Sequence, residues 1–362
     1  MIKTLTGLRS ILFLFIFCTH FRWAVYGSEA GRSLFEILFL GRYGVLFFIL
    51  LSGFCIALGY ADKFSTISAE KYGNFLKKRL IKIYPLYVLT GLIALFVFQF
   101  HSERIQAICS FILSYLPMIQ TWGIIKLKGV GNGVAWFVSI IFLCYLITPF
   151  ILVVLNKIKD LKFHILFCII NYLILLSFSL ILVAHNDSQN NFFYVFPPVR
   201  IIEYMIGLDV GFVYVKILKN KMNFEISSKL KNLIDILFII LFLFCIYWLP
   251  NNLLVRHALA MPLFCCLMIY LCYEKESILY NFLSGKLCNF IGNVSYECFL
   301  IHYLVLEILK PCYQIYIHTM GNLIMLFIGL FVLSVLLSYK YKNLQDKIIQ
   351  QFIANRKNIE VK

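Results

Sequence analysis

The first apolar segment of the chain, residues 5–23, contains two side chains that are rare inside a membrane and chemically useful. Arg9 and His20 lie eleven residues apart in it. Eleven steps of about 100° place both side chains on one face of a helix, with roughly 16 Å of rise between them. A guanidinium binds anions, and an imidazole exchanges protons near neutral pH. Because ionisable groups are costly within a span, this spacing predicts that both residues line a cavity or a substrate path. The alternative is that Arg9 snorkels to the headgroups and His20 lies at the opposite interface.

A cluster of cations stands at the start of the apolar segment 80–100. It consists of Lys77, Lys78, Arg79 and Lys82. Clustered cations at the mouth of a cavity suit a polyanionic ligand such as a phosphate. Lysines and arginines at the end of a span also anchor it in the membrane. The sequence leaves both interpretations open, and neither excludes the other.

Other polar residues lie within or beside later apolar segments. Arg42 precedes one segment, Arg200 and Glu203 lie three residues apart in another, and His302 lies in the middle of 287–309. The spacing of Arg200 and Glu203 indicates a pair within one helix, either a structural salt bridge or a ligand contact. His302 is either a buried histidine bonded by a neighbouring helix or part of a cavity.

The composition indicates which elements position these side chains. Of the 362 residues, 62% are hydrophobic and 14% are charged, with a mean hydropathy of +0.87. Soluble domains contain about 45–50% apolar and about 25% charged residues, so we predict an all-α bundle of transmembrane helices. The predicted spans are residues 5–23, 45–61, 80–100, 134–155, 162–184, 198–218, 231–249, 256–273, 287–309 and 321–338. Residues 105–122 form a shorter apolar stretch with polar flanks, which we expect to re-enter the membrane or to lie at its interface.

The charge distribution predicts the orientation of the bundle. Lysine and arginine number 33 against 17 acidic residues, a net charge of +16. With ten spans, 24 of the 33 fall on one side, which by the positive-inside rule is the cytoplasm and contains both termini. A full crossing by 105–122 would move the basic loop 216–231 and the basic tail outside. We therefore expect a membrane-embedded domain over residues 1–339 and a cytoplasmic basic tail over 340–362. Topology accounts for the positive charge, so we expect no nucleic-acid partner.

Several standard sites are missing from the sequence. Twelve cysteines lie mostly within or beside apolar segments, and no C-x-x-C pair occurs, so we interpret them as small buried hydrophobic residues. No His/Cys set has metal-ligand spacing, and neither a G-x-S-x-G elbow nor a Gly-rich phosphate loop occurs. We expect no metal cofactor.

Six segments together resemble, in order, the acyltransferase 3 family of integral membrane transacylases. The resemblance covers nearly the whole chain, from residue 5 to residue 302. Its motif residues are Arg9 and His20 of the Arg-x10-His signature; Ser52, Gly53, Phe54 and Ile56; Lys78, Arg79, Lys82, Tyr84 and Pro85; Trp136, Ser139, Tyr145 and Pro149; Arg200, Glu203 and Gly207; and Gly292, Ser295, Tyr296 and His302.

The chain also departs from the family pattern. Leu46 and Ile141 stand where many members carry acidic residues, and some basic positions are lysine instead of arginine, which removes bidentate phosphate contacts. In these respects the chain resembles the branch of the family without the acidic residues.

The resemblance implies transfer of an acyl group, usually acetyl from acetyl-CoA in the cytoplasm, to a hydroxyl of a carbohydrate. Acceptors in the family include lipopolysaccharide O-antigen, other polysaccharides of the cell envelope and lipid-linked sugars. It implies a multi-pass protein of the bacterial inner membrane. The transfer is either direct or completed by a separate extracytoplasmic transferase. Acetyl or a longer acyl group, and direct attack or an acyl-histidine, remain open.

The resemblance also implies roles for the residues above. His20 is the candidate general base, since an alcohol is not deprotonated at neutral pH without one. Arg9 and the cluster Lys77, Lys78, Arg79 and Lys82 would hold the coenzyme A phosphates. The residues expected to line the substrate cavity are Arg42, Trp136, Ser139, Arg200, Glu203 and His302. A protein of another class, a transporter or flippase for a sugar-lipid or small metabolite, would use a similar polar cavity, although the inverted repeats typical of transporters are not evident.

Overall fold

The computed structural model describes residues 2–25, 40–99, 104–122, 130–185, 194–219, 227–250, 252–273, 275–313 and 319–360. Every regular element in these ranges is a helix. The α-helices are α1 (Lys3–Val25), α3 (Gly41–Tyr60), α4 (Ala69–Ala94), α5 (Arg104–Ser110), α6 (Trp136–Lys157), α7 (Leu161–Ala184), α9 (Pro197–Val213), α10 (Ser228–Tyr247), α11 (Leu253–Val255), α12 (Met261–Tyr273), α13 (Ile278–Ser284), α14 (Lys286–Asn293), α15 (Ser295–Tyr313) and α16 (Met320–Glu360). The π-helical turns are η1 (Leu95–Gln99), η2 (Phe111–Tyr115), η3 (Tyr214–Leu218) and η4 (Arg256–Ala260).

The bundle has the predicted class of fold. In the described ranges, eight helices are long and apolar enough to cross a membrane, and they correspond to eight of the ten predicted spans. The predicted span 198–218 is also helical, as α9 and η3. The predicted span 287–309 is two helices rather than one, because the chain bends at Val294 between α14 and α15. The chain is a multi-pass membrane protein built from helices.

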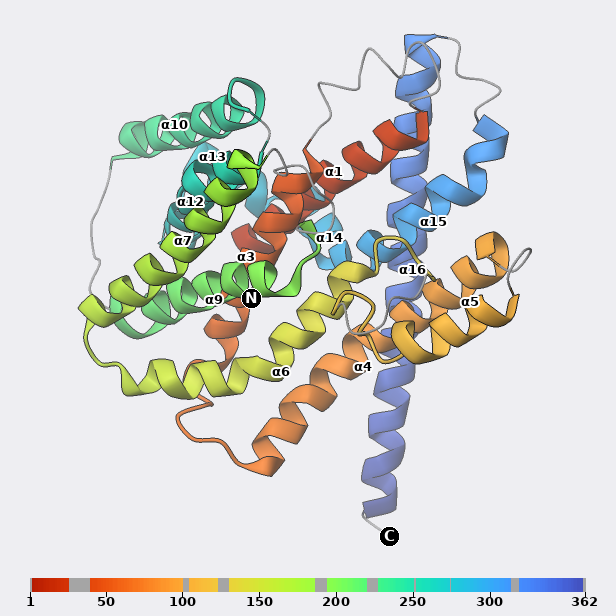
Figure 1. The fold of residues 1–362 in the computed structure, drawn as a ribbon, viewed down its shortest axis with the longest axis horizontal. Helices are drawn as coiled ribbons and strands as arrows, with labels where there is room; N and C mark the ends of the chain where they lie inside the picture. Colours follow the sequence, from red (N-terminus) through yellow and green to blue (C-terminus); the bar gives the residue numbers. More distant parts are fainter. Residues whose placement is uncertain are drawn as a thin grey trace.

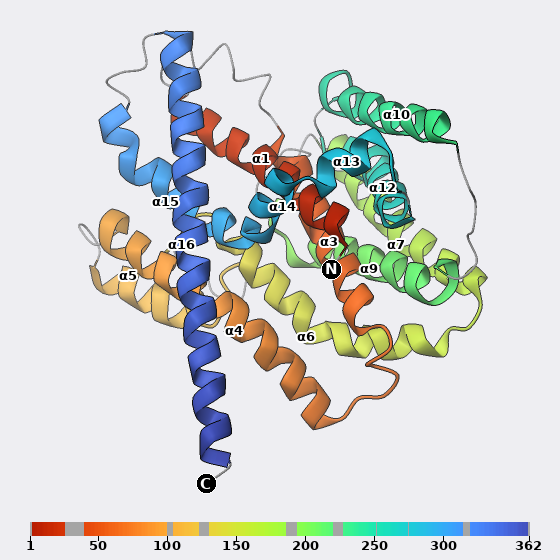
Figure 2. The same cartoon turned by 180° about the vertical axis from the view of Figure 1, so that it is seen from behind.

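The helix α1 lies in the centre of the bundle. Figures 1 and 2 show α15 and α16 on one side of it and α3, α9 and α12 on the other. The bend after α14 lets that short helix cross close beneath the start of α1. A Cβ at Gly292 would overlap the carbonyl oxygen of Thr6, so only glycine allows this approach. The central position of α1 gives its polar side chains access to neighbours on several sides.

The helices α3 and α9 pack backbone against backbone. A Cβ at Gly207 would overlap the Leu50 carbonyl group, and one at Gly53 would meet the Tyr204 carbonyl oxygen. Small residues at such crossings are the usual means of close helix packing in membranes, where apolar burial from water adds little. This contact fixes α9, and with it Arg200 and Glu203, against the second span.

The short apolar stretch folds back against α4. The apolar helix Ile105–Tyr115 is too short to cross a bilayer. Its end is tied to α4 by the Tyr87 hydroxyl, which donates to the Tyr115 carbonyl oxygen at 2.6 Å, and the two rings stack with centroids 4.3 Å apart. Met118 then turns the chain with a φ of 59°. This arrangement agrees with a re-entrant or interfacial segment.

The last helix is much longer than a membrane is thick. The 41 residues of α16 extend over about 60 Å, twice the hydrocarbon thickness of about 30 Å. Figure 1 shows its C-terminal half projecting beyond the other helices. Near the predicted start of the tail, Lys342 Nζ donates to the Asn293 carbonyl oxygen at 2.6 Å. The tail thus begins as a direct continuation of the last span.

Candidate active site

A cavity of about 910 Å³ lies between the N-terminal half of α1, the C-terminal half of α3 and α4. We call it the basic cavity, because Arg9, Arg79, Lys82 and Lys219 line it. The carboxylate of Asp62, also on its wall, is paired with Lys216. The wall therefore has an excess of positive charge, which suits a polyanion.

The predicted cation cluster is divided by the structure. Arg79 and Lys82 line the basic cavity, whereas Lys77 and Lys78 lie exposed on α4 outside it. The Arg79 guanidinium carbon lies 4.9 Å from the centroid of the Tyr60 ring and 5.6 Å from that of Tyr145. Arg79 Nε is buried and has no hydrogen-bond acceptor among the described residues. A guanidinium held by aromatic rings, with a donor left over, is suited to an anionic ligand.

A second, smaller cavity of about 250 Å³ lies beside the C-terminal half of α1. We call it the histidine pocket, because His20 lines it. Its polar and aromatic wall residues are Thr19, His20, Arg42, Trp136, Tyr194 and Phe299. Arg9 and His20 thus serve different cavities from one helix, as their predicted spacing of about 16 Å requires. Of the predicted cavity residues, Arg42 and Trp136 lie on this wall.

His20 is bonded to the second predicted histidine. His20 Nδ1 lies 2.9 Å from His302 Nε2, and His302 Nδ1 lies 2.9 Å from the Cys298 carbonyl oxygen. His302 is fully buried, and the rings of Phe13 and Phe17 pack on it with centroids 5.6 and 6.1 Å away. His302 lies behind His20 instead of lining either cavity.

These contacts determine where the protons of the neutral pair lie. A carbonyl oxygen only accepts, so His302 Nδ1 carries the hydrogen and its Nε2 has the lone pair. His20 Nδ1 must then donate to His302 Nε2. The remaining nitrogen, His20 Nε2, is left unprotonated as a proton acceptor. This is the tautomer that a general base in the histidine pocket requires.

Arg200 and Glu203 lie behind the wall of the histidine pocket rather than on it. Arg200 Nη1 donates to Glu203 Oε2 at 2.7 Å, and Glu203 Oε1 lies 2.8 Å from His257 Nε2. Arg200 Nε donates to the Tyr194 carbonyl oxygen at 2.8 Å, and its guanidinium carbon lies 5.1 Å from the centroid of the Tyr194 ring. The buried pair therefore supports the wall residue Tyr194.

Three further positions from the sequence analysis are buried: Ser139, Ile141 and Leu46. Ser139 is fully buried and donates to the Met118 carbonyl oxygen, so it lines neither cavity and holds the end of the segment 105–122 to α6. Ile141 lines the basic cavity, and Leu46 is buried in the packing between helices. At Ile141 the basic cavity therefore has an apolar wall.

The residues missed by sequence reasoning are mostly aromatic. Tyr194 and Phe299 line the histidine pocket, and Tyr60 lies beside Arg79 in the basic cavity. Tyr145, one of the motif residues, also lies beside Arg79. The aromatic residues make up 17% of the chain, so one more of them in an apolar segment carries no signal. Lys219, on the wall of the basic cavity, was counted only as a topological charge.

The bundle thus contains a basic cavity and a histidine pocket, each lined by a polar residue of α1. The chain matches the acyltransferase domain family, Acyl_transf_3, over residues 2–340 and belongs to that family. This family match favours an acyltransferase over the transporter or flippase that the sequence left open.

One curated relative is also named as an acyltransferase. Acyltransferase MdmB of Streptomyces mycarofaciens is 30% identical over 154 residues, which are 41% of this chain and 38% of that protein. The similarity thus spans well under half the length of either protein. No solved structure matches the chain.

Proposed function

We propose that the protein transfers an acetyl group from acetyl-CoA to a hydroxyl of a carbohydrate of the cell envelope, with His20 as general base. The observation that carries the proposal is the bond from His20 to His302, which leaves His20 Nε2 as an acceptor inside the histidine pocket. The proposal places the protein in the inner membrane of a bacterium with both termini in the cytoplasm. Reporter fusions after residue 220 and at the C-terminus are then expected to read as cytoplasmic, and an extracytoplasmic signal at either would contradict this orientation.

The donor is assigned to the basic cavity. Arg9, Arg79 and Lys82 supply cations for the several phosphates of coenzyme A. A volume of about 910 Å³ is near the upper end of ligand pockets, about 1,000 Å³, as a large nucleotide thioester requires. The extended pantetheine arm spans on the order of 15–20 Å, comparable to the rise from Arg9 to His20 of about 16 Å. Phosphates held at Arg9 thus bring the thioester near His20.

The acceptor is assigned to the histidine pocket. Trp136 and Tyr194 form an aromatic corner there, with ring centroids 5.2 Å apart, and Arg42 lies over the Tyr194 ring. Flat aromatic surfaces with polar neighbours provide apolar contact together with hydrogen bonds, which suits a sugar ring. A volume of about 250 Å³ holds one end of an acceptor and not a long chain.

The reaction uses His20 twice. His20 Nε2 takes the proton of the acceptor hydroxyl as its oxygen attacks the thioester carbonyl carbon. A C–O bond forms, the C–S bond breaks, and His20 returns the proton to the leaving thiolate of coenzyme A. His302 accepts the hydrogen bond from His20 Nδ1 throughout and supports the positive charge that His20 acquires. Direct transfer needs no separate extracytoplasmic transferase, although such a protein would receive the same acetyl group at the same pocket.

The test uses the full chain in membrane vesicles and after purification. Coenzyme A binding is measured by calorimetry, and transfer from radiolabelled acetyl-CoA to the endogenous glycans of the vesicles is measured in parallel. We expect His20→Ala to bind coenzyme A as the wild type does and to lose transfer. Near-normal transfer by His20→Ala would overturn the catalytic assignment, and the absence of coenzyme A binding by the wild type would overturn the donor.

A further inference from the structure

One aromatic ring separates the two cavities. Among the described residues, Phe299 alone lines both the basic cavity and the histidine pocket. It belongs to α15 one turn before His302 and is only 4% exposed. The two reactants assigned above would therefore both lie against this residue.

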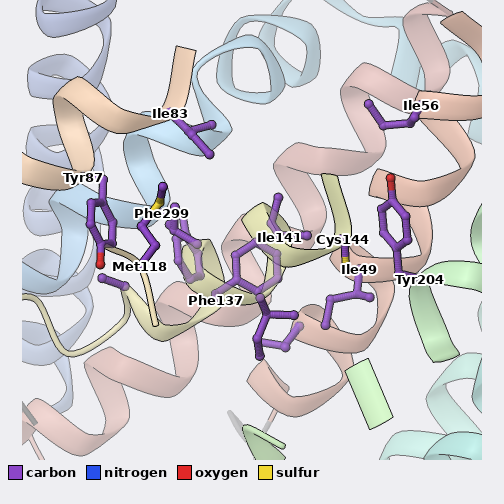
Figure 3. Packing of buried hydrophobic residues seen from close by; sticks show 14 of the residues in the cluster. Ile49, Ile56, Ile83, Tyr87, Met118, Phe137, Ile141, Cys144, Tyr204 and Phe299 are labelled. Atoms are coloured by element: carbon purple, nitrogen blue, oxygen red, sulfur yellow. The ribbon is translucent and has the colours of Figure 1, made fainter. Parts of the chain in front are cut away.

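Neighbouring rings complete this partition. Phe137 packs on Phe299 with ring centroids 4.9 Å apart, and Phe48 packs on Phe137 at 6.4 Å. Figure 3 shows Phe137 and Phe299 side by side, with Ile141 beyond them. Phe48, Phe137 and Ile141 line the basic cavity and not the histidine pocket. The end of the basic cavity is thus apolar, although its wall carries several cations.

The partition has a chemical consequence, which rests on the proposed function. Transfer requires the thioester carbon to reach His20 Nε2, and His20 lines only the histidine pocket, which meets the basic cavity at Phe299. A passage that stayed open would also let water in the histidine pocket attack the thioester. That side reaction forms a C–O bond to water, breaks the C–S bond and yields a carboxylic acid and free coenzyme A, with His20 moving the proton as before.

We propose that Phe299 is a gate between the donor and acceptor cavities that admits short acyl groups and holds back both longer ones and water. The acyl group must pass the ring and fit beside the acceptor in a pocket of about 250 Å³. Each added methylene in a filled apolar pocket changes selectivity by about 10-fold or more. Phe299 thereby determines which acyl groups can be transferred as well as whether water reaches the thioester.

The experiment compares acetyl-, butyryl- and hexanoyl-CoA with the purified full chain, with and without vesicle glycan, and follows free thiol release. In Phe299→Ala, we expect thiol release without acceptor to rise about tenfold, and use of butyryl-CoA relative to acetyl-CoA to rise about tenfold. The double variant with His20→Ala is expected to lose this hydrolysis. Phe264→Ala is the matched control, since Phe264 is equally buried, stacks on Phe47 at 4.1 Å and lines neither cavity.

Two further variants keep the test decisive if Phe299→Ala does not fold. Phe299→Leu is expected to shift acyl preference in the same direction by a smaller factor. Phe299→Trp is expected to keep coenzyme A binding and to slow acetyl transfer. An unchanged acyl profile and unchanged hydrolysis in active Phe299 variants would overturn the gate while leaving the proposed function intact. A wild type that neither binds nor uses acetyl-CoA would instead overturn the proposed function and the gate with it.

Discussion

The basic cavity and the histidine pocket differ in how many side chains share the work of each. The basic cavity has several cations on long side chains from α1, α4 and the residue after η3, so the loss of one leaves others. The histidine pocket depends on one nitrogen, whose proton state follows from a single chain of bonds through His302 to the Cys298 carbonyl oxygen. Binding of the donor is distributed, and proton transfer is concentrated.

Moving the base should be the most damaging change. In a variant with Thr19→His and His20→Thr, the imidazole remains in α1 but rotates by about 100° away from His302. We expect acetyl transfer to fall by about 10²–10⁴-fold, the range that general base catalysis contributes, with coenzyme A binding unchanged. Thiol-release kinetics and calorimetry on the same preparation measure both. Retained transfer would mean that the base does not depend on the hydrogen bond between His20 and His302.

His302 should act through kcat and not through donor affinity. His302→Leu removes the acceptor for His20 Nδ1, so we expect kcat to fall by about 10²-fold while KM for acetyl-CoA stays the same. His302→Gln retains an oxygen that can accept this hydrogen bond and should recover part of the rate. If His302→Leu and His302→Gln lower kcat equally, or if both variants raise KM for acetyl-CoA, His302 has only a packing role.

Single changes in the basic cavity should have smaller effects. Arg79→Gln removes one guanidinium from the wall, and a lost hydrogen bond to a charged group corresponds to an increase in KM for acetyl-CoA of about tenfold. Lys78→Gln, one position away and outside the cavity, is the matched control and should leave KM unchanged. Both variants should keep the kcat of the wild type. An equal loss of affinity in both would mean that net charge near the membrane, rather than the cavity wall, attracts the donor.

The features that could be predicted from the sequence are those that do not depend on long-range packing. Hydropathy located the spans, since crossing a bilayer requires a length of apolar helix, and helical periodicity related Arg9 to His20. Periodicity also places Lys77 about 200° from Arg79, but it leaves Lys78 only about 40° from Lys82, so only the position of α4 against its neighbours excludes Lys78. The break at Val294 was missed because hydropathy is averaged over a window of about 19 residues, which runs across a bend without registering it.

The partners of buried polar groups were beyond prediction for the same reason. His20 and His302 are 282 residues apart in the chain, and nothing in the sequence says which histidine faces which. Arg200 and Glu203 were identified as a pair by spacing, yet the bond from Arg200 to the Tyr194 carbonyl oxygen depends on how the backbone enters α9. The residue type and spacing of Phe299 do not distinguish it from other aromatic residues. It stands out only because it lines both cavities.

A single unbroken helix, α1, carries both Arg9 and His20. When a bilayer thins or thickens, helices respond mainly by tilting, and a tilted α1 carries both residues with it as one rigid rod. The span between the anchor for the donor phosphates and the base is therefore independent of the lipid around the protein. In an enzyme that divided these roles between two helices, the distance between them would change whenever the helices slid past each other, whereas here one continuous helix fixes it.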